Sequence, residues 1–326
     1  MSSAIRRVAI TGAAGYVAGM LMERLEREAG IERVLALDVR PLRAQPSSKV
    51  VYRQHDVTAP MADLLAEHEI DAIAHLAYVL RPSHNRAAIE RINVGGAINV
   101  LKACEQAGVK HLLYLSSTSI YGAHADNPPF LTEDSPTQPV LGFQYSEDKA
   151  RVETLIAEFA KRHPETTAVV LRACPVMGPN ADNFIASAFS KPVLVGVRGC
   201  DPPMQFLHED DLADALSRCL LQQVSGVYNL TGDGTIRWSE MAELFGRRLM
   251  LMPAPLLYGL TSLTWTLRLQ RDSPSCGLDF IRHRWTASNE KLKRELGIQP
   301  RYSSKEAWEA FVQRDEKRPH VKEMQR

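Results

Sequence analysis

The sequence predicts an α/β fold, a doubly wound parallel sheet with a smaller, mostly C-terminal substrate-binding region. In the first half of the 326-residue chain, short apolar runs alternate with helical patterns, which is typical of a parallel sheet covered by helices. A glycine-rich turn joins the first apolar run to the first helical pattern. After Arg172, prolines and loops replace the alternation, so a second kind of region begins there.

The apolar runs of the first half predict the strands of the sheet. Each run is short and rich in branched apolar residues, as expected of a strand buried on both faces. The predicted strands are Arg7–Thr11, Arg33–Asp38, Val50–His55, Ala72–Leu76, His111–Ser116 and Ala168–Arg172.

Apolar residues at helical spacing predict the covering helices between these strands. The predicted helices are Val17–Glu28, Met61–His68, Asn85–Ala107 and Gln144–Arg162, with later ones at Asp210–Gln222, Ser239–Leu249 and Ser288–Leu296. We therefore divide the chain into a nucleotide-binding domain, residues 1–172, and a substrate-binding region, residues 173–326. The last predicted strand still belongs to the first sheet, so the boundary is not expected to be clean.

Composition excludes several classes of protein. The formal net charge is +1, which favours neither nucleic acid nor an anionic membrane as the main partner. Five cysteines without zinc or disulfide spacing indicate a reducing compartment and no metal site. No apolar run is long enough to span a bilayer and no signal peptide is evident. We expect a cytoplasmic protein with a small-molecule substrate, and leave a homodimer open.

The first strand leads into a dinucleotide-binding fingerprint of the Rossmann type. Gly12 allows a tight turn, and Gly15 lets the backbone approach a pyrophosphate at a helix N-terminus, where Tyr16 and Val17 begin the helix. The third position of the pattern is Ala18, which is still small enough for close packing of helix and strand.

Asp38 ends the second strand, 20 residues after Ala18. A carboxylate there can accept both hydroxyls of a ribose. It would repel the 2′-phosphate of NADP, so NAD is the favoured cofactor. Arg40 is the counter-argument, because a guanidinium can pair with that phosphate, although a solvated surface arginine explains Arg40 as well.

Tyr145 and Lys149 are four residues apart on a predicted helix, so they share one face. Free tyrosine has a pKa of about 10, too high for a base at neutral pH. We expect the ammonium and an oxidised nicotinamide to lower it. Ser117 follows a strand, where its hydroxyl can bond a substrate oxygen. Ser117, Tyr145 and Lys149 are the predicted catalytic residues.

These motifs together resemble the extended short-chain dehydrogenase/reductases, in particular their NAD-dependent epimerase/dehydratase branch, which includes the UDP-glucose 4-epimerases. The resemblance covers about residues 5–235. It rests on Thr11–Ala18, Asp38, His55–Val57, His75–Ala77, Asn93–Val100, Leu115–Gly122, Tyr145–Lys149, Leu171–Arg172, Gly178–Pro179 and Phe206–Ala213.

The resemblance implies further cofactor residues. It implies that Asp56 and Val57 flank the adenine, that Leu76 and Ala77 line the cofactor channel, and that Lys149 also holds the nicotinamide ribose. Asn93 and Cys174 complete the set of expected cofactor-binding residues, which is Gly12, Gly15, Tyr16, Val17, Asp38, Asp56, Val57, Leu76, Ala77, Asn93, Tyr145, Lys149 and Cys174. For Cys174, a small buried apolar residue is an equal explanation.

Departures from the family concern the substrate. Pro175 stands where the nucleotide-sugar enzymes carry an asparagine, and Met204 stands where they carry an arginine. Each change removes a polar contact to a sugar diphosphate. We therefore expect UDP-sugars to bind weakly or not at all. Thr118 and Ser119 stand where a dehydratase carries its additional acid–base pair, which disfavours elimination chemistry.

A late apolar stretch has leucines at helical spacing, namely Leu256, Leu260, Leu263 and Leu267. Such stripes ordinarily face a core, so we expect a helix packed on the substrate region. A lid over an apolar substrate, a dimer contact or a membrane-surface helix are the alternatives.

The predicted function is NAD-dependent hydride transfer at a secondary alcohol of a sugar or sugar-like substrate, by a dehydrogenase or an epimerase. One alternative is a dehydrogenase of an apolar, steroid-like alcohol. Another is a non-catalytic NAD(H)-binding scaffold or redox sensor, against which the intact Ser117, Tyr145 and Lys149 count. His208 is interpreted as a structural hydrogen-bonding residue at a helix start.

Overall fold

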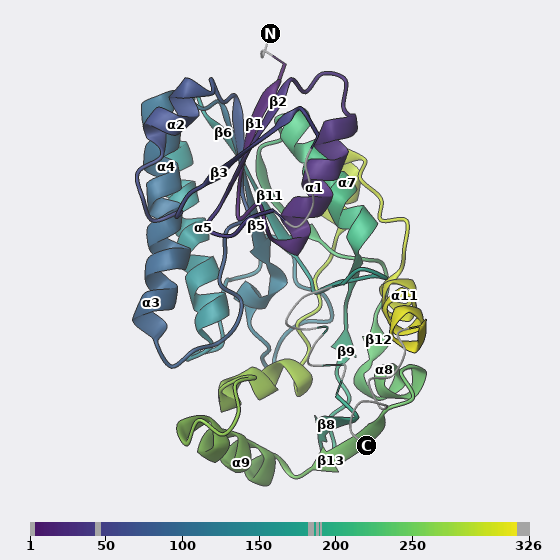
Figure 1. Cartoon of the computed structure of the whole chain (residues 1–326). Coiled ribbons are helices and arrows are strands. Elements are labelled where there is room, and N and C mark those ends of the chain that lie inside the picture. Colours follow the sequence, from purple (N-terminus) through teal and green to yellow (C-terminus); the bar gives the residue numbers. More distant parts are fainter. Residues whose placement is uncertain (1–3, 43–46, 182–185, 187–188, 190, 318–326) are drawn as a thin grey trace, which may run out of the picture.

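The computed structural model confirms the predicted α/β fold (Figure 1). It describes residues 4–42, 47–181, 186, 189 and 191–317. Seven parallel strands form the main sheet in the order β11-β6-β5-β4-β1-β2-β3. Their bounds are β1 Arg7–Thr11, β2 Arg33–Asp38, β3 Val50–Gln54, β4 Ala72–His75, β5 His111–Ser117, β6 Thr167–Ala173 and β11 Gly226–Leu230.

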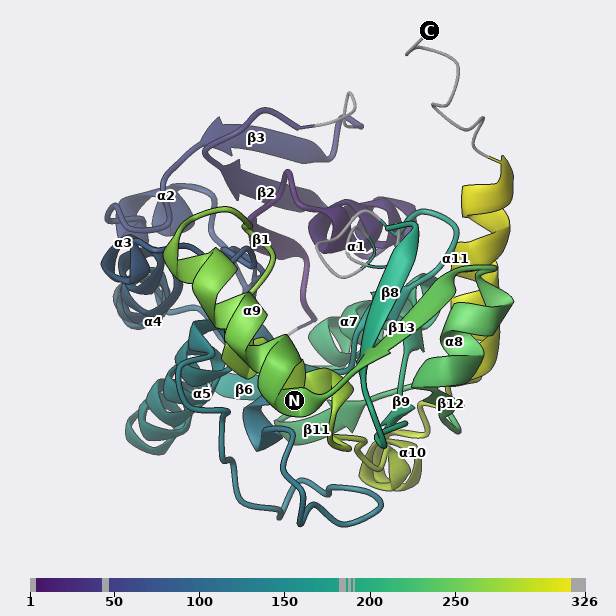
Figure 2. The same cartoon turned by 90° about the horizontal axis from the view of Figure 1, so that it is seen from below.

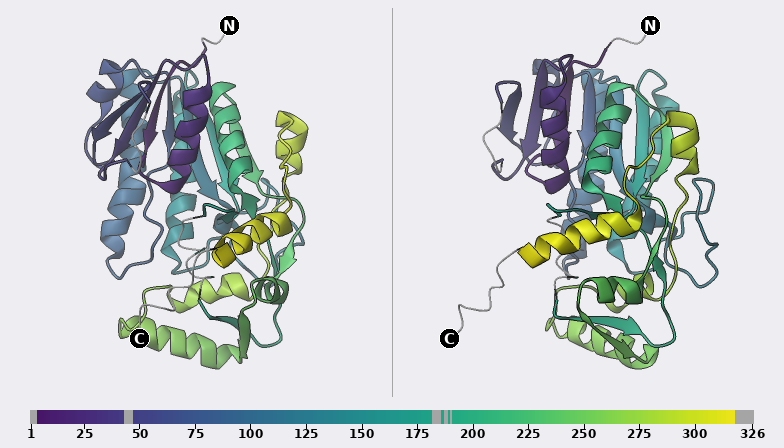
Figure 3. Two further views of the ribbon diagram at one scale, coloured as in Figure 1. Left: turned by 45° about the vertical axis from the view of Figure 1, so that its right-hand side comes forward. Right: turned by 90° about the vertical axis from the view of Figure 1, so that its right-hand side faces the viewer.

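Helices cover both faces of this sheet, as Figures 1 and 3 show. One face carries α1 (Tyr16–Arg27) and α7 (Glu209–Leu221), and its core includes Leu21, Leu25 and Leu216. The other face carries α2 (Ala62–Glu67), α4 (Gly96–Ala107) and α5 (Gln144–Arg162), with a second core around Tyr114 and Phe159. The predicted helix 85–107 is interrupted, because a π-helical turn, η1 (Arg91–Gly95), separates α4 from the short α3 (Arg86–Glu90).

The sheet takes its last strand and one covering helix from beyond residue 172. β11 pairs with β6, with Tyr228 opposite Leu171, and α7 packs beside α1. No strand was predicted at Gly226–Leu230, a short run that opens with a glycine. The residues of the main sheet therefore extend well past 172.

The smaller region lies below the carboxyl ends of the strands in Figure 1. A third core holds it together, in which Trp308 stacks on Phe206 at 5.3 Å between ring centroids. Its elements are β7 Val176–Met177, β8 Val193–Val197, β9 Pro203–Met204, β10 Leu207–His208, β12 Ile236–Arg237, β13 Arg248–Met252, η2 Thr118–Tyr121, α8 Trp238–Leu244, α9 Ala254–Thr266, η3 Ser275–Ile281, α10 Glu290–Leu296 and α11 Ser304–Lys317, with η2 coming from the first half. Within the described ranges no helix is both long and apolar enough to cross a membrane.

One sequence prediction about this region is wrong. The leucine stripe does lie on a helix, α9, but Leu256, Leu260, Leu263 and the cap residue Leu267 are all exposed rather than packed on the substrate region. Figure 2, the view from below, shows α9 lying across this end of the molecule, with β8 and β13 beyond its N-terminal end. The side chains that hold α9 lie on its opposite face, where Trp265 stacks on His84.

Candidate active site

The glycine-rich turn lies where β1 meets α1. Gly12 has a φ of 73°, and a Cβ there would lie 2.6 Å from the Cα of Ala77. Only glycine fits this close approach to the chain after β4. Gly15 is the N-cap of α1, and among the described residues no side chain caps that helix end. Its free amides and its helix dipole suit a pyrophosphate.

The Tyr16 side chain links the glycine-rich turn to the start of α7. Its hydroxyl donates a short hydrogen bond to Glu209, the buried first residue of α7. Burial, followed by the bond to Glu209, raises the pKa of Tyr16. Glu209 also accepts from the Asn180 side chain at 2.8 Å. The Tyr16 side chain is thus engaged within the protein, and Val17 packs on the core of the same sheet face.

Asp38 lies at the carboxyl end of β2, buried beside the glycine-rich turn. One carboxylate oxygen accepts from the Ala14 amide at 3.0 Å and the other from the Arg40 amide at 2.9 Å. The Arg40 guanidinium is mostly exposed, and its Nε lies 3.4 Å from Asp38. Arg40 therefore pairs with the Asp38 carboxylate while most of its side chain stays exposed.

The expected adenine and channel residues lie at neighbouring strand ends. Asp56 accepts from the Thr58 amide at 2.9 Å, which lowers the pKa of Asp56. Val57 packs against α4 so closely that a Cβ on Gly96 would lie 2.7 Å from it. The amides of Leu76 and Ala77 donate to the Thr11 hydroxyl at 3.2 and 3.3 Å, which fixes the chain after β4.

Asn93 lies on the π-helical turn and joins two segments. Its Oδ1 accepts from the Val79 amide at 2.8 Å, and its Nδ2 donates to Asp148 at 3.1 Å. Burial raises the pKa of Asp148. Asn93 therefore links the loop after β4 to α5, next to Lys149, which makes it a positioning residue here.

Ser117 and Tyr145, the two predicted catalytic hydroxyls, are brought together. Ser117 ends β5, and its Oγ accepts from the Ser119 amide at 3.2 Å. The Ser117 side chain is close enough to the Tyr145 phenol to lower the pKa of Tyr145. Burial has the larger effect and raises that pKa above its ordinary value. In the chain itself burial outweighs this polar contact, and the lowering expected with an oxidised nicotinamide bound stays a prediction.

Lys149 lies one helical turn further along α5. Its ammonium donates to the Leu115 carbonyl at 2.6 Å and stands 3.9 Å from the ring centroid of Tyr78. Burial lowers the pKa of Lys149 to about 7, although Glu153 and Asp148 favour the charged form. A lysine that exchanges its proton near neutral pH suits a proton-transfer site.

Tyr78 is a site residue that sequence reasoning missed. Its hydroxyl donates to the Tyr145 carbonyl at 2.9 Å, and the two rings meet edge to face at 5.3 Å. Tyr78 therefore contacts both Tyr145 and Lys149. Its position directly after the His75–Ala77 motif could have indicated this. Residues that follow β4 lie close to those that follow β5, because the two strands are neighbours in the sheet.

Cys174 and His208 both lie in buried positions. Cys174 is buried in the core of the α1 face, and burial raises the pKa of its thiol to about 12. His208 is the N-cap of α7 and accepts from the Asp210 amide at 3.2 Å, while its ring stacks on Tyr302. This confirms the structural interpretation of His208.

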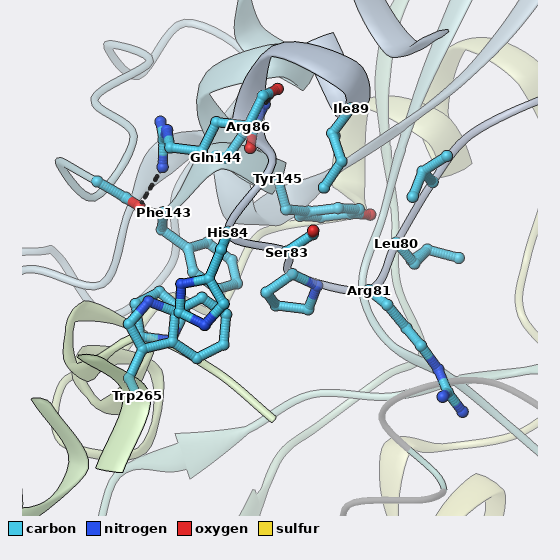
Figure 4. A pocket seen from close by; sticks show the side chains of 14 residues that line it. Leu80, Arg81, Ser83, His84, Arg86, Ile89, Phe143, Gln144, Tyr145 and Trp265 are labelled. Atoms are coloured by element: carbon cyan, nitrogen blue, oxygen red, sulfur yellow. Dashed lines mark hydrogen bonds between the residues drawn. The ribbon is translucent and has the colours of Figure 1, made fainter. Parts of the chain in front are cut away.

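A cavity of about 140 Å³ adjoins Tyr145 (Figure 4). Its lining combines apolar side chains, including Leu80, Ile89, Phe143 and Trp265, with the polar or charged side chains of Arg81, Ser83, His84, Arg86 and Gln144. Arg86 belongs to the lining but is engaged, since it donates to the Gly142 carbonyl at 3.0 Å and pairs with Glu147 at 2.7 Å. The described residues contain no group of three or more His, Cys, Asp or Glu able to hold a metal ion.

The residues that depart from the nucleotide-sugar enzymes face inward. Met204 is buried in the third core, and Pro175 is buried with its carbonyl accepting from Leu207 at 3.0 Å. Arg282, a candidate replacement clamp, lies over the Tyr258 ring at 5.7 Å. Arg198, the other candidate, is exposed and follows β8.

The sheet order, the glycine-rich turn and the Ser117–Tyr145–Lys149 set define an extended short-chain dehydrogenase/reductase. Within that class, the chain belongs to the NAD-dependent epimerase/dehydratase family, whose model matches residues 8–231.

Relatives and solved structures agree with this assignment. An uncharacterised protein of Mycobacterium tuberculosis is 26% identical over 319 residues, which cover 93% of this chain and 82% of that protein. UDP-glucuronic acid decarboxylase 2 of Arabidopsis thaliana is 27% identical over 259 residues, 73% of this chain and 56% of that protein.

Two solved structures match almost the whole chain. MoeE5 in complex with UDP-glucose and NAD has a TM-score of 0.74 at 25% identity, covering 95% of this chain and 98% of that one. The UDP-glucose 4-epimerase of Thermus thermophilus in complex with NAD has a TM-score of 0.75 at 21% identity, covering 96% and 100%. The second likeness concerns the fold alone.

Proposed function

We propose that this protein is an NAD-dependent oxidoreductase that transfers hydride at a secondary alcohol of a sugar or sugar-like substrate, as a dehydrogenase or an epimerase. The observation that carries the proposal is the placement of Ser117, which ends β5, beside Tyr145 at the start of α5, with Lys149 one turn further along α5. Ligands of open parallel sheets bind at such strand ends. A non-catalytic scaffold has no need of this set.

The residues present fit NAD. The uncapped start of α1 offers amides to a pyrophosphate, and Asp38 offers acceptor oxygens to ribose hydroxyls. Bound NAD would supply the hydride acceptor. The buried Asp38 carboxylate disfavours the 2′-phosphate of NADP, and Arg40 already pairs with Asp38. MoeE5, a structure with similar fold and 25% identity, is described with NAD.

The roles of the catalytic residues follow from their contacts. Burial keeps Tyr145 a phenol at neutral pH, so it is ready to give a proton to a carbonyl in the direction of reduction. In the direction of oxidation Tyr145 can take the alcohol proton only after it has lost its own, and a positive charge beside it is required to favour this phenolate. Ser117 orients the substrate oxygen through its hydroxyl. Lys149, with a pKa of about 7, provides that charge and holds the cofactor ribose.

The substrate is proposed to lack a nucleotide diphosphate. A diphosphate needs paired, charge-assisted contacts, but Met204 is buried and Arg282 is engaged with Tyr258. MoeE5 is described with UDP-glucose, so the proposal separates this chain from that relative. The apolar side chains in the lining of the cavity beside Tyr145 favour a second candidate, an apolar, steroid-like alcohol.

The test is turnover of a panel of UDP-sugars, free sugars, polyols and sterols, measured as NADH formation for a dehydrogenase and by NMR of the product for an epimerase, which forms no net NADH. We expect turnover with a substrate that lacks UDP, and a lower kcat/KM when NADP replaces NAD. Tyr145→Phe should lower kcat by about 10²–10⁴-fold, the usual contribution of a proton carrier, and leave NAD binding nearly unchanged. Tyr228→Phe, which removes a hydroxyl on β11, is the matched control.

Three results would contradict parts of the proposal. Near-normal turnover by Tyr145→Phe would remove the assigned proton carrier. Binding of NAD without turnover on any panel member would favour the scaffold. Micromolar binding of UDP that is lost on changing Arg198 or Arg282 would restore a nucleotide-sugar substrate.

A further inference from the structure

The apolar face of α9 is ordered and exposed. Leu256, Leu260, Leu263 and Leu267 are 52%, 44%, 55% and 57% exposed. At 3.6 residues per turn they lie within an arc of about 60° on the helix. Met250 and Leu251, on the strand β13 that leads into α9, are also exposed. An apolar patch of this kind marks an interaction surface.

Contacts on the other side of α9 hold this face outward. Leu257 is buried, and the Tyr258 hydroxyl donates to Asp279 at 2.5 Å. Trp265 stacks on His84, with 4.3 Å between ring centroids. Tyr258 and Trp265 lie on the face opposite the leucine stripe, and Leu257 lies at its flank. These contacts fix the orientation of α9, and the leucines therefore stay exposed.

Charge around the patch is one-sided. The helix α9 has no charged residue, and residues 247–284, which contain it, have six arginines, two aspartates, no lysine and no glutamate. That is a formal charge of +4, against +1 for the whole chain. Arg248, Arg268, Arg271 and Arg284 are exposed. Both aspartates are engaged, Asp272 with Lys191 and Asp279 with Tyr258.

We infer that α9 docks on the surface of an anionic lipid membrane, with its axis in the membrane plane. Exposed leucines with flanking basic residues bind the boundary between headgroups and acyl chains. The leucines would enter that boundary, and the arginines would meet lipid phosphates. The 13-residue helix lies on the membrane and does not span it.

The charge pattern favours a membrane over a second copy of the chain. A two-fold dimer through this face would place the same patch of both copies together. The exposed arginines of one copy would then face those of the other, and juxtaposed like charges oppose association. Lipid phosphates provide the opposite charge.

Docking through α9 would bring the cavity near the lipid. Trp265 of α9 and Tyr145 both line that cavity (Figure 4). The docking inference does not depend on the reaction assigned to Tyr145, and its test needs no turnover.

The test is co-sedimentation of the full-length protein with vesicles. We expect binding to vesicles of equal parts phosphatidylcholine and phosphatidylglycerol. Binding to phosphatidylcholine alone should be weaker by roughly twentyfold or more, since each arginine near an anionic surface contributes about fivefold. Leu260→Glu with Leu263→Glu should lower the partition coefficient by about tenfold or more, because leucine burial is lost. Arg268→Asn with Arg271→Gln should lower it by roughly twentyfold.

Controls keep the result specific. Ile98→Glu changes a similarly exposed apolar residue on α4 and should bind like the unmodified protein. Circular dichroism and NAD titration check that each variant is folded. No binding to anionic vesicles, or equal loss in Ile98→Glu, would overturn the inference. So would a light-scattering mass that falls from dimer to monomer in the leucine variant, because a second copy would then cover α9.

Discussion

The helices α1 and α9 are built from the same apolar spacing and end in opposite environments. In α1, Leu21 and Leu25 are fully buried against the main sheet. In α9, Leu260 and Leu263 project into solvent. Periodicity shows that a helix has an apolar face, but it does not show what that face contacts.

The other face of each helix carries the missing information. Outside its apolar stripe, α1 has Glu23, Arg24 and Arg27, as expected of a surface that meets water. The helix α9 has no charged residue on either face, and its second face carries Tyr258 and Trp265, which contact the protein. A helix without a charged face has no side that is well suited to water. In this protein the face that carries Tyr258 and Trp265 packs against the rest of the chain.

One leucine substitution in each helix tests this comparison most directly. Leu25→Ala in α1 should lower the free energy of unfolding by about 2–5 kcal/mol, because it leaves a cavity in a packed core. Leu263→Ala in α9 should change it by about 0.5 kcal/mol or less, as for an exposed position. Urea denaturation of both variants measures this, and equal losses would mean that α9 is buried in the folded protein in solution.

A buried charge in the sheet half should give the next largest effect. The pKa of Lys149 is lowered to about 7 in the folded chain, while the unfolded value is about 10.4. Between these values the unfolded chain binds more protons, so the Lys149 contribution to stability rises with pH, by up to about 1.4 kcal/mol per pH unit. The cost of burying the ammonium is fully present below pH 7.

Lys149→Met removes this titration and nearly keeps the volume. The free energy of unfolding of the unmodified protein, minus that of Lys149→Met, should therefore rise by about 2 kcal/mol between pH 7.5 and 9.5. Urea denaturation at several pH values measures the difference. A flat difference would show that Lys149 is charged in the folded protein throughout this range.

The smallest effect concerns the attached face of α9. Tyr258→Phe removes the hydrogen bond to Asp279 and should cost about 1 kcal/mol. It should also speed amide hydrogen exchange in α9 relative to α1. Unchanged exchange would mean that Leu257 and Trp265 alone fix the helix.

The fold could be predicted from sequence wherever local patterns determine it. The strands Arg7–Thr11 and Arg33–Asp38 match their predicted bounds. Gly226–Leu230 was missed, since its pairing with β6 is made across more than 50 residues and leaves little local trace. The solvent exposure of Leu256–Leu267 was missed for a related reason, because exposure depends on what the rest of the chain leaves uncovered.

For the site, spacing predicted which residues come together but not their electrostatics. Ser117 and Tyr145 do meet, although 28 residues separate them, because one follows a strand and the other begins the next helix. The raised pKa of Tyr145 could not be predicted, since burial arises from many contacts at once. Tyr78 lacked a motif of its own, and only the sheet order places it against Lys149.

Asp38 shows why exchanging the cofactor of this chain is not a matter of charge alone. Its carboxylate accepts from Ala14 in the glycine-rich turn and from Arg40 in the next loop. It is therefore a brace between two loops as well as a ribose ligand in the proposed complex. A redesign for NADP that replaces Asp38 with a small neutral residue also leaves two amides without an acceptor. A successful redesign must supply new acceptors for both amides before Arg40 can contribute to binding the 2′-phosphate of NADP.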